Sequence, residues 1–320
     1  SGAIGRRLLP QLVARGHEVT GTTRDPANVE VIAALGARPM VVDGLDATAV
    51  GEAVARARPD AIIHEMTALS GPSDFRRFDR WFATTNRLRT EGTRHLLAAA
   101  QAAGAERFLA QSYTGWNNRR DRGPVVTEED PLDPDVLPGQ RETFAAIEAL
   151  EAAVTGAPLD GIILRYGALY GPGASEPLIE LFRQRKLPIM GRGDGVWSNV
   201  HVDDAAAATV AALERGRAGT YNVVDDEPVR VAEFLPAVAA LVGAKPPLRI
   251  PVWLGRVLAG DVAVRILAEV RGASNHKAKR DLGWQPIWPD WRDGFRNGLD
   301  VPVPDPGTTV SATAGRRSIA

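Results

Sequence analysis

Ser1-Gly2-Ala3-Ile4-Gly5-Arg6-Arg7-Leu8-Leu9 opens the chain, and its two glycines stand directly before a helical pattern. The apolar residues at positions 8, 9, 12 and 13 follow helical spacing, and Gly16 ends this helix. The next segment is a short strand that ends in Thr22-Thr23-Arg24. A glycine-rich turn, a helix and then a strand indicate the beginning of an α/β domain.

Strand and helix patterns continue to alternate through the first two thirds of the chain. Strands are predicted at 38–42, 61–64, 107–110 and 161–165, and alanine-rich amphipathic helices at 47–57, 85–103 and 142–155. Apolar strands that alternate with helices are typical of a parallel sheet covered on both faces. After residue 166 the pattern loosens and Gly, Pro and Trp become frequent, which predicts a smaller C-terminal lobe.

Composition excludes several classes of protein. The 320 residues carry 38 basic and 39 acidic side chains, and this balance argues against a nucleic-acid binder. No apolar run reaches the roughly 18 residues of a membrane span, and the twin arginines precede no signal-peptide pattern, so a cytoplasmic protein is expected. Cysteine is absent, and the five histidines lack metal-ligand spacing, so no metal site is predicted.

A series of landmarks resembles the extended and atypical short-chain dehydrogenases/reductases, often labelled NAD-dependent epimerase/dehydratase. Gly2 and Gly5 match the last two glycines of the G-x-x-G-x-x-G motif in that family, and Asn86 precedes Gly92-Thr93. The remaining landmarks are Val42-Asp43-Gly44-Leu45-Asp46, Gln111-Ser112, Leu164-Arg165-Tyr166-Gly167, Tyr170-Gly171-Pro172-Gly173, Val200-His201-Val202-Asp203-Asp204, Tyr221-Asn222-Val223 and Leu282-Gly283-Trp284-Gln285-Pro286.

The resemblance implies a Rossmann-type doubly wound parallel sheet with a smaller C-terminal substrate lobe. The expected division is a dinucleotide-binding domain over 1–165, a substrate lobe over 166–299 and a disordered tail over 300–320. Residues 200–224 are expected to return to the first domain, and the first strand of the sheet is expected upstream of Ser1. A monomer or a homodimer is expected.

The resemblance also implies a nicotinamide cofactor. Its pyrophosphate would lie at the turn formed by Gly2, Ile4 and Gly5, at a helix N-terminus. The second strand ends in Arg24 rather than in the carboxylate that binds the ribose hydroxyl of NAD, which favours NADP(H) over NAD(H), although Asp25 follows. A solvated loop position for Arg24 is the alternative. The other expected cofactor residues are Asp43, Leu45, Thr67, Ala68, Gln111 and Tyr166.

The catalytic pattern of the family is broken. Most relatives use Tyr-x-x-x-Lys, in which the lysine lowers the tyrosine pKa so that the phenol can move a proton. None of the four tyrosines here is followed by lysine at that spacing. With Glu151 aligned four residues after the lysine position, Thr143 occupies the tyrosine position and Ile147 the lysine position. Ser112 matches the serine of the family.

Two hypotheses follow. In the first, an NADPH-dependent ketoreductase reduces a carbonyl of a polycyclic aromatic or similar small molecule, with Ser112 and Thr143 polarising the oxygen. Water or a substrate hydroxyl then supplies the proton. In the second, the protein is an inactive NADP-binding sensor or scaffold. Nucleotide-sugar epimerase or dehydratase chemistry is disfavoured because it needs a base. Tyr113, Trp116 and Trp197 are predicted to bind the substrate.

Overall fold

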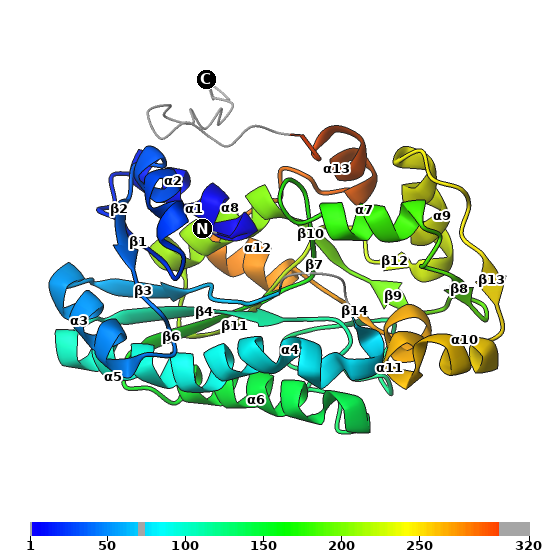
Figure 1. The fold of residues 1–320 in the computed structure, drawn as a ribbon, viewed down its shortest axis with the longest axis horizontal. Coiled ribbons are helices and arrows are strands. Elements are labelled where there is room, and N and C mark those ends of the chain that lie inside the picture. Colours follow the sequence, from blue (N-terminus) through cyan, green and yellow to red (C-terminus); the bar gives the residue numbers. More distant parts are fainter. Residues whose placement is uncertain (1, 70–73, 301–320) are drawn as a thin grey trace, which may run out of the picture.

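A parallel sheet of four strands forms the centre of the computed structural model, which describes residues 2–69 and 74–300. Its order is β11 (Gly219–Val223), β6 (Asp160–Tyr166), β4 (Arg107–Tyr113) and β3 (Ala61–His64). Beside it, β1 (Thr20–Thr23) and β2 (Arg38–Val41) form a parallel pair (Figure 1). The expected strand upstream of Ser1 has no counterpart in this sequence and stays a prediction.

Helices cover both faces of the sheet. In Figure 1, one face lies against α1 (Ala3–Ala14) and α8 (Val202–Arg215). The other lies against α3 (Ala47–Ala57), α4 (Phe78–Arg87), α5 (Thr93–Ala103) and α6 (Arg141–Thr155). Because the strands are buried on both sides, they read as continuous apolar runs: Leu109, Ile162 and Leu164 are fully buried.

The helix expected at 85–103 is longer and interrupted. It starts at Phe78 as α4, passes through a five-residue π-helical segment at 88–92, and continues as α5 to Ala103. Gly104, with φ of +74°, ends it in the left-handed conformation that glycine adopts without strain. The π segment interrupts the α-helical hydrogen bonding next to the sheet edge at which the strands end.

The second lobe has its own apolar core, built around Phe182, Phe234, Trp291 and Phe295. Its helices are α7 (Glu176–Arg183), α9 (Val231–Leu241), α10 (Val252–Ala259), α11 (Asp261–Val264) and α13 (Trp291–Asn297). The short strands are β5 (Val125–Val126), β7 (Ala168–Tyr170), β8 (Ile189–Met190), β9 (Val196–Trp197), β10 (Asn199–His201), β12 (Val229–Arg230), β13 (Arg249–Ile250) and β14 (Gly272–Ala273). The two remaining helices are α2 (Val29–Ala34) and α12 (His276–Leu282).

The predicted fold class is confirmed: this is a Rossmann-like α/β fold with a parallel sheet. The domain boundaries stay predictions, and from residue 301 onward the expected tail lies outside the described residues. β11 pairs in parallel with β6, so the segment around 219–223 joins the central sheet. No helix among residues 2–69 and 74–300 is both long and apolar enough to cross a bilayer.

Candidate active site

The N-terminus of α1 is built to receive an anion. Gly2 is its N-cap residue, with extended backbone and no capping side chain, and the first turn carries no acidic residue. The positions where Cβ atoms of Gly2 and Gly5 would stand have no heavy atom within 4 Å. Free backbone N–H groups and open space at a helix N-terminus fit a phosphate. Ile4 is buried in the core, so only its backbone can take part.

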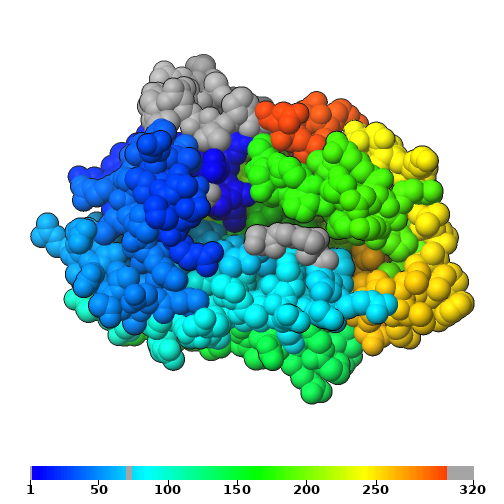
Figure 2. Space-filling model, in the orientation of Figure 1, coloured from blue at the N-terminus to red at the C-terminus, as the bar shows by residue number. Residues whose placement is uncertain are grey.

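A loop from the second lobe reaches the same helix end. Gly173 adopts φ of +81°, and a Cβ on it would stand 3.6 Å from the Cβ of Ala3. Figure 2 shows the surface hollowed where the blue N-terminal residues meet the green segment. The two lobes therefore border one recess at the predicted phosphate site.

The residues that follow the strands lie at the carboxyl edge of the sheet, as a ligand-binding α/β fold requires. Arg24 is exposed, whereas the Asp25 carboxylate accepts the Ala27 N–H at 3.0 Å and caps the following turn. Asp43 accepts the Leu45 N–H at 3.0 Å. Thr67 is exposed, and the Ala68 N–H donates to a threonine hydroxyl of α4 at 3.0 Å. Arg24 and Asp25 are therefore both exposed at this edge, and the Asp25 carboxylate is engaged by a backbone N–H.

The Ser112 hydroxyl is turned away from this edge. It donates to Glu151 Oε1 at 2.6 Å, and Arg165 binds both carboxylate oxygens of Glu151 at 2.8 and 2.5 Å. Both partners of this ion pair are nearly buried, with side chains 11% and 12% exposed. Ser112 thus joins β4 to α6, and its predicted role in polarising a substrate oxygen stays a prediction.

Thr143 is also engaged inside the protein. Its hydroxyl donates to Asp79 at 2.7 Å and accepts from the Asn86 amide at 3.1 Å, and its backbone N–H donates to Asp79 at 2.9 Å. Ile147, at the lysine position, is 1% exposed and packs in an aromatic cluster. The face of α6 that carries Thr143 and Ile147, where the resemblance predicted the acid and its cation, is therefore a closed, packed surface.

Three predicted substrate residues do come together. Tyr113, Trp116 and Trp197 line one cavity of about 100 Å³. The ring centroids of Tyr113 and Trp116 are stacked 6.0 Å apart. The other lining residues are Thr114, Gly115, Ala168, Ser198, Ile266 and Val270. A narrow cavity walled by stacked aromatic rings suits a flat substrate.

Tyr113 brings a hydroxyl to this cavity. No hydrogen bond of this hydroxyl is found among the described residues, and burial raises the pKa of Tyr113 to about 12. A Cβ on Gly115, whose φ is +153°, would stand 2.5 Å from that hydroxyl, so glycine keeps the place of the phenol open. Tyr113 is therefore a neutral hydrogen-bond donor over the physiological range.

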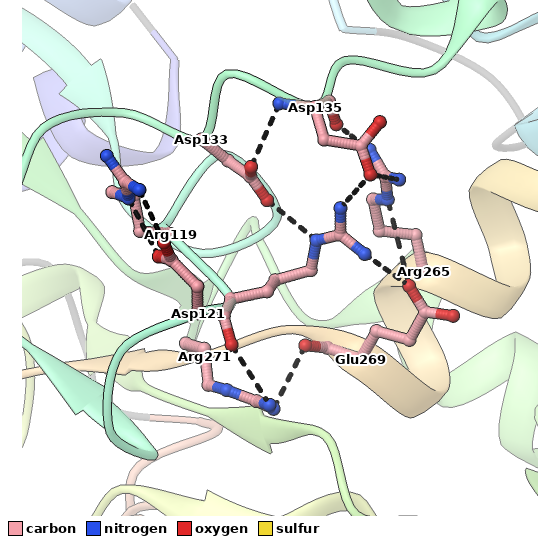
Figure 3. Close-up of polar contacts among 8 residues, drawn as sticks. Arg119, Asp121, Asp133, Asp135, Arg265, Glu269 and Arg271 are labelled. Carbon is pink, nitrogen blue, oxygen red and sulfur yellow. Dashed lines mark hydrogen bonds and ion pairs between the residues drawn. The ribbon is translucent and has the colours of Figure 1, made fainter.

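An ion-pair network holds the loop that follows Trp116 in the sequence, and Figure 3 shows its contacts. At its centre, Arg120 donates to Asp133 at 2.6 Å, to Glu269 at 2.8 Å and also to Asp135. Arg265 donates to the Asp135 backbone from the opposite side. These contacts join residues about 120–135 to the segment that carries Ile266 and Val270, so the two walls of the cavity are held to each other.

One acidic residue escaped the sequence reasoning. Glu65 directly follows β3, and its carboxyl lies 2.9 Å from the Tyr166 hydroxyl, which in turn lies 2.5 Å from Thr209 Oγ1. Burial raises the pKa of Glu65 to about 8, although the hydrogen bond with Tyr166 lowers it. Gln111 is half-buried on the neighbouring strand. The sequence signal that could have identified Glu65 is an acidic residue directly after the apolar strand Ala61–His64.

Histidines and acidic clusters offer no metal centre in the part of the chain that the structure describes. His64 is buried, bonds to the Leu88 carbonyl at 3.2 Å, and has its pKa lowered to about 4 by burial. It therefore acts as a neutral core residue.

Residues 1–224 match the NAD dependent epimerase/dehydratase family. The chain belongs to that family, as its sequence predicted. The family match and the reductases among the relatives identify the chain as an NAD(P)-dependent oxidoreductase.

Several of the similar proteins are named as reductases. The chain is 43% identical over 301 residues to the 3-diazoavenalumate denitrifying reductase of Streptomyces sp, covering 92% of this chain and 96% of the relative. It is 27% identical to the 4-hydroxy-2-methyl-3-oxo-4-farnesyl-3,4-dihydroquinoline-1-oxide ketoreductase of Stigmatella aurantiaca, covering 89% of each. UDP-glucose 4-epimerase of Thermus thermophilus, solved in complex with NAD, shares the fold at a TM-score of 0.70 and 24% identity, over 93% of this chain and 95% of that one. The predicted reductase class is confirmed.

Proposed function

We propose that this reductase uses NADPH to replace the diazo group of an ortho-diazophenol by hydrogen, releasing N₂. One observation carries the proposal: Thr143 and Ile147, at the positions that the family resemblance assigns to the acid and its cation, are closed inside the protein. A carbonyl needs a proton on its oxygen as hydride arrives, whereas a diazo carbon does not. The 43% identical relative is named for a denitrifying reduction, which supports the same chemistry.

The residues present fit the cofactor. Gly2 and Gly5 offer open backbone for the pyrophosphate, with nothing within 4 Å of either Cβ position. Exposed Arg24 would bind the 2′-phosphate of NADPH, since Asp25 is held as a cap. Asp43, Leu45, Thr67, Ala68, Gln111 and Tyr166 are proposed to line the rest of the site. When bound, NADPH supplies a hydride.

The reaction balances without an acid from the protein. The hydride forms a C–H bond at the ring carbon that carries the diazo group. The C–N bond breaks, and its electron pair leaves on N₂. The ring oxygen, which bears negative charge in the diazophenolate form, becomes an ordinary phenolate and takes a proton from solvent. Because protonation follows bond breaking, no tyrosine–lysine pair is required.

The cavity residues orient the substrate. The Tyr113 hydroxyl would donate to the ring oxygen beside the diazo carbon, and its high pKa keeps it a donor. Trp116 and Trp197 would hold the ring flat and exclude water, with the Trp197 indole fixed by a 2.8 Å hydrogen bond to the Ile266 carbonyl. Ser112 and Thr143 support this arrangement through α6 rather than by touching the substrate.

Reduction of an aromatic ketone with an adjacent hydroxyl is the second candidate. The Tyr113 donor in the cavity favours it, because a phenol beside a carbonyl oxygen can stabilise the developing alkoxide. Relatives named as ketoreductases support it too. The sensor hypothesis would leave the cavity without a reacting ligand.

The test is a turnover assay with NADPH and three classes of substrate: ortho-diazophenols, ortho-hydroxyaryl ketones and nucleotide sugars. The proposal expects NADPH oxidation with N₂ release only for the first class, and Tyr113→Phe should raise KM. Turnover of the ketones alone would establish the second candidate. Tight cofactor binding without turnover of any class would support the sensor.

A further inference from the structure

Glu65 is a buried carboxyl that the proposed reaction does not use. It stands directly after β3, at the carboxyl edge where this fold binds ligands. Its Oε1 contacts the Tyr166 hydroxyl, and its Oε2 is buried without a hydrogen-bond partner among the described residues. A buried oxygen without a partner is costly unless the group is protonated or a ligand completes it.

The hydrogen bonds around Glu65 indicate which form is present. The Thr209 hydroxyl donates its one proton to the Ala205 carbonyl at 2.8 Å. With an ionised carboxylate, Tyr166 donates to Glu65 Oε1 at 2.9 Å. The 2.5 Å contact between Tyr166 and Thr209 is then left without a donor, because the Thr209 proton is already given to Ala205. All three contacts have a donor only when the Glu65 carboxyl carries a proton as well.

Other charged groups near this position are engaged elsewhere. The titratable and charged residues that β3, β4, β6, α1 and α8 carry near the same edge are His64, Tyr113, Arg165, Arg6, Arg7, Asp203 and Asp204. His64 bonds to Leu88, Arg165 pairs with Glu151, and Arg7 pairs with Asp203 at 3.2 Å. Asp204 accepts the N–H groups of Ile287 and Trp288. Tyr166 alone among titratable groups contacts the Glu65 carboxyl in the part of the chain that the structure describes.

The place of Glu65 lies between the two ends of the cofactor site. Tyr166 is the register partner of Tyr113, so the two phenols stand on one face of the sheet. Tyr113 lines the substrate cavity, and Ile4, in the phosphate turn, belongs to the same core cluster as Tyr166. A cofactor anchored at Gly2 must pass the row formed by Tyr166 and Tyr113 to bring its reacting ring to the cavity.

We propose that Glu65 couples a proton to the redox state of the cofactor: its carboxyl is neutral beside the reduced, uncharged ring and ionised beside the oxidised ring, which is cationic. The inference rests on the proposed cofactor role of Tyr166. A carboxylate next to a cation is stabilised, whereas burial beside a neutral ring favours the protonated acid. Glu65 would thus hold the oxidised cofactor tightly only after it has released its proton.

The test measures the dissociation constants of NADP⁺ and NADPH from about pH 6 to about pH 9.5. Their ratio cancels the titration of the 2′-phosphate, which both forms share. In the wild type the relative affinity for NADP⁺ should rise with pH, about tenfold for each unit by which the cation lowers the pKa of Glu65. NADP⁺ binding near neutral pH should release close to one proton per site.

Glu65→Gln should abolish both the pH dependence and the proton release. Glu128→Gln is the matched control. Burial also raises the pKa of Glu128, but its carboxylate accepts the Asn222 N–H and does not contact Tyr166. This variant should behave as wild type. If Glu65→Gln fails to fold, infrared difference spectra of the wild type should still show loss of a protonated carboxyl band when NADP⁺ binds.

A pH-independent affinity ratio in the wild type, or an unchanged pH dependence in Glu65→Gln, would overturn this inference. Both outcomes leave the proposed reaction intact, since the cofactor would still bind. Failure of either cofactor form to bind would instead overturn the proposed function itself. The two failures are therefore distinguishable in one set of titrations.

Discussion

Replacing Thr143 by Val separates a structural hydroxyl from a catalytic one. The substitution removes the 2.7 Å hydrogen bond to Asp79 and the 3.1 Å bond from Asn86. Asp79 keeps the Thr143 backbone N–H at 2.9 Å, so the cap of α6 survives in part. The Asn86 amide, which is buried, loses its acceptor, and its Oδ1 already lacks a partner among the described residues.

The expected cost is one unsatisfied buried donor. Such a group lowers the free energy of unfolding by about 1–3 kcal/mol. For a chain of 320 residues each kcal/mol lowers Tm by roughly 1.5 °C, because the entropy of unfolding grows with chain length. Turnover should change by less than about threefold, which corresponds to under 1 kcal/mol of transition-state stabilisation, because the hydroxyl faces α4 rather than the cavity.

The assay pairs urea unfolding with kcat and KM for the accepted substrate at saturating NADPH. Thr143→Ser is the control: it keeps the hydroxyl and should recover most of the hydrogen-bonding contribution to stability. A Thr143→Val protein with wild-type Tm and a loss of kcat beyond roughly a hundredfold would refute the reasoning, since that pattern marks an obligatory proton carrier.

Three further outcomes are expected. Arg24→Ala should weaken NADPH binding roughly tenfold without changing NADH binding, as loss of a charge-assisted contact predicts; equal weakening of both would contradict the 2′-phosphate assignment. Arg165→Met should lower the free energy of unfolding by about 3–5 kcal/mol, because Glu151 is left nearly buried and unpaired; a neutral effect would mean that Glu151 takes up a proton readily. The pKa of Glu65 is raised from 4.5 to about 8, so an unfolded chain ionises first and stability falls as pH rises across that window. The free energy of unfolding of Glu65→Gln should not show this decrease with pH. Identical pH profiles of stability for Glu65→Gln and the wild type would argue against a protonated Glu65.

The fold could be predicted because its information is local. The middle residues of strands β4 and β6 are apolar because helices cover both faces, and that composition is visible without a structure. The break in the catalytic pattern was equally visible, because the spacing after each tyrosine can be counted. Glycines directly before a helix likewise predict a phosphate site from their position in the sequence alone.

The direction of side chains could not be predicted. Ser112 and Tyr113 are neighbours, so they face opposite sides of β4, and only the packing of α6 determines that Ser112 bonds to Glu151 while Tyr113 reaches the cavity. Thr143 is held by Asp79, 64 residues away, through a contact that no local pattern encodes. Glu65 acquires its raised pKa from burial, which is a property of the assembled core.

The central claim is that hydride reaches a diazo carbon without a proton from the protein. Its most direct measurement is a single turnover of an ortho-diazophenol with NADPH deuterated at the transferred position, followed by mass spectrometry and NMR of the product. One deuterium is expected at the carbon that carried the diazo group, together with one N₂ released per NADPH oxidised. No ring label is expected when unlabelled NADPH is used in D₂O. Hydrogen from solvent at that carbon, or NADPH oxidation with the C–N bond intact, would contradict it.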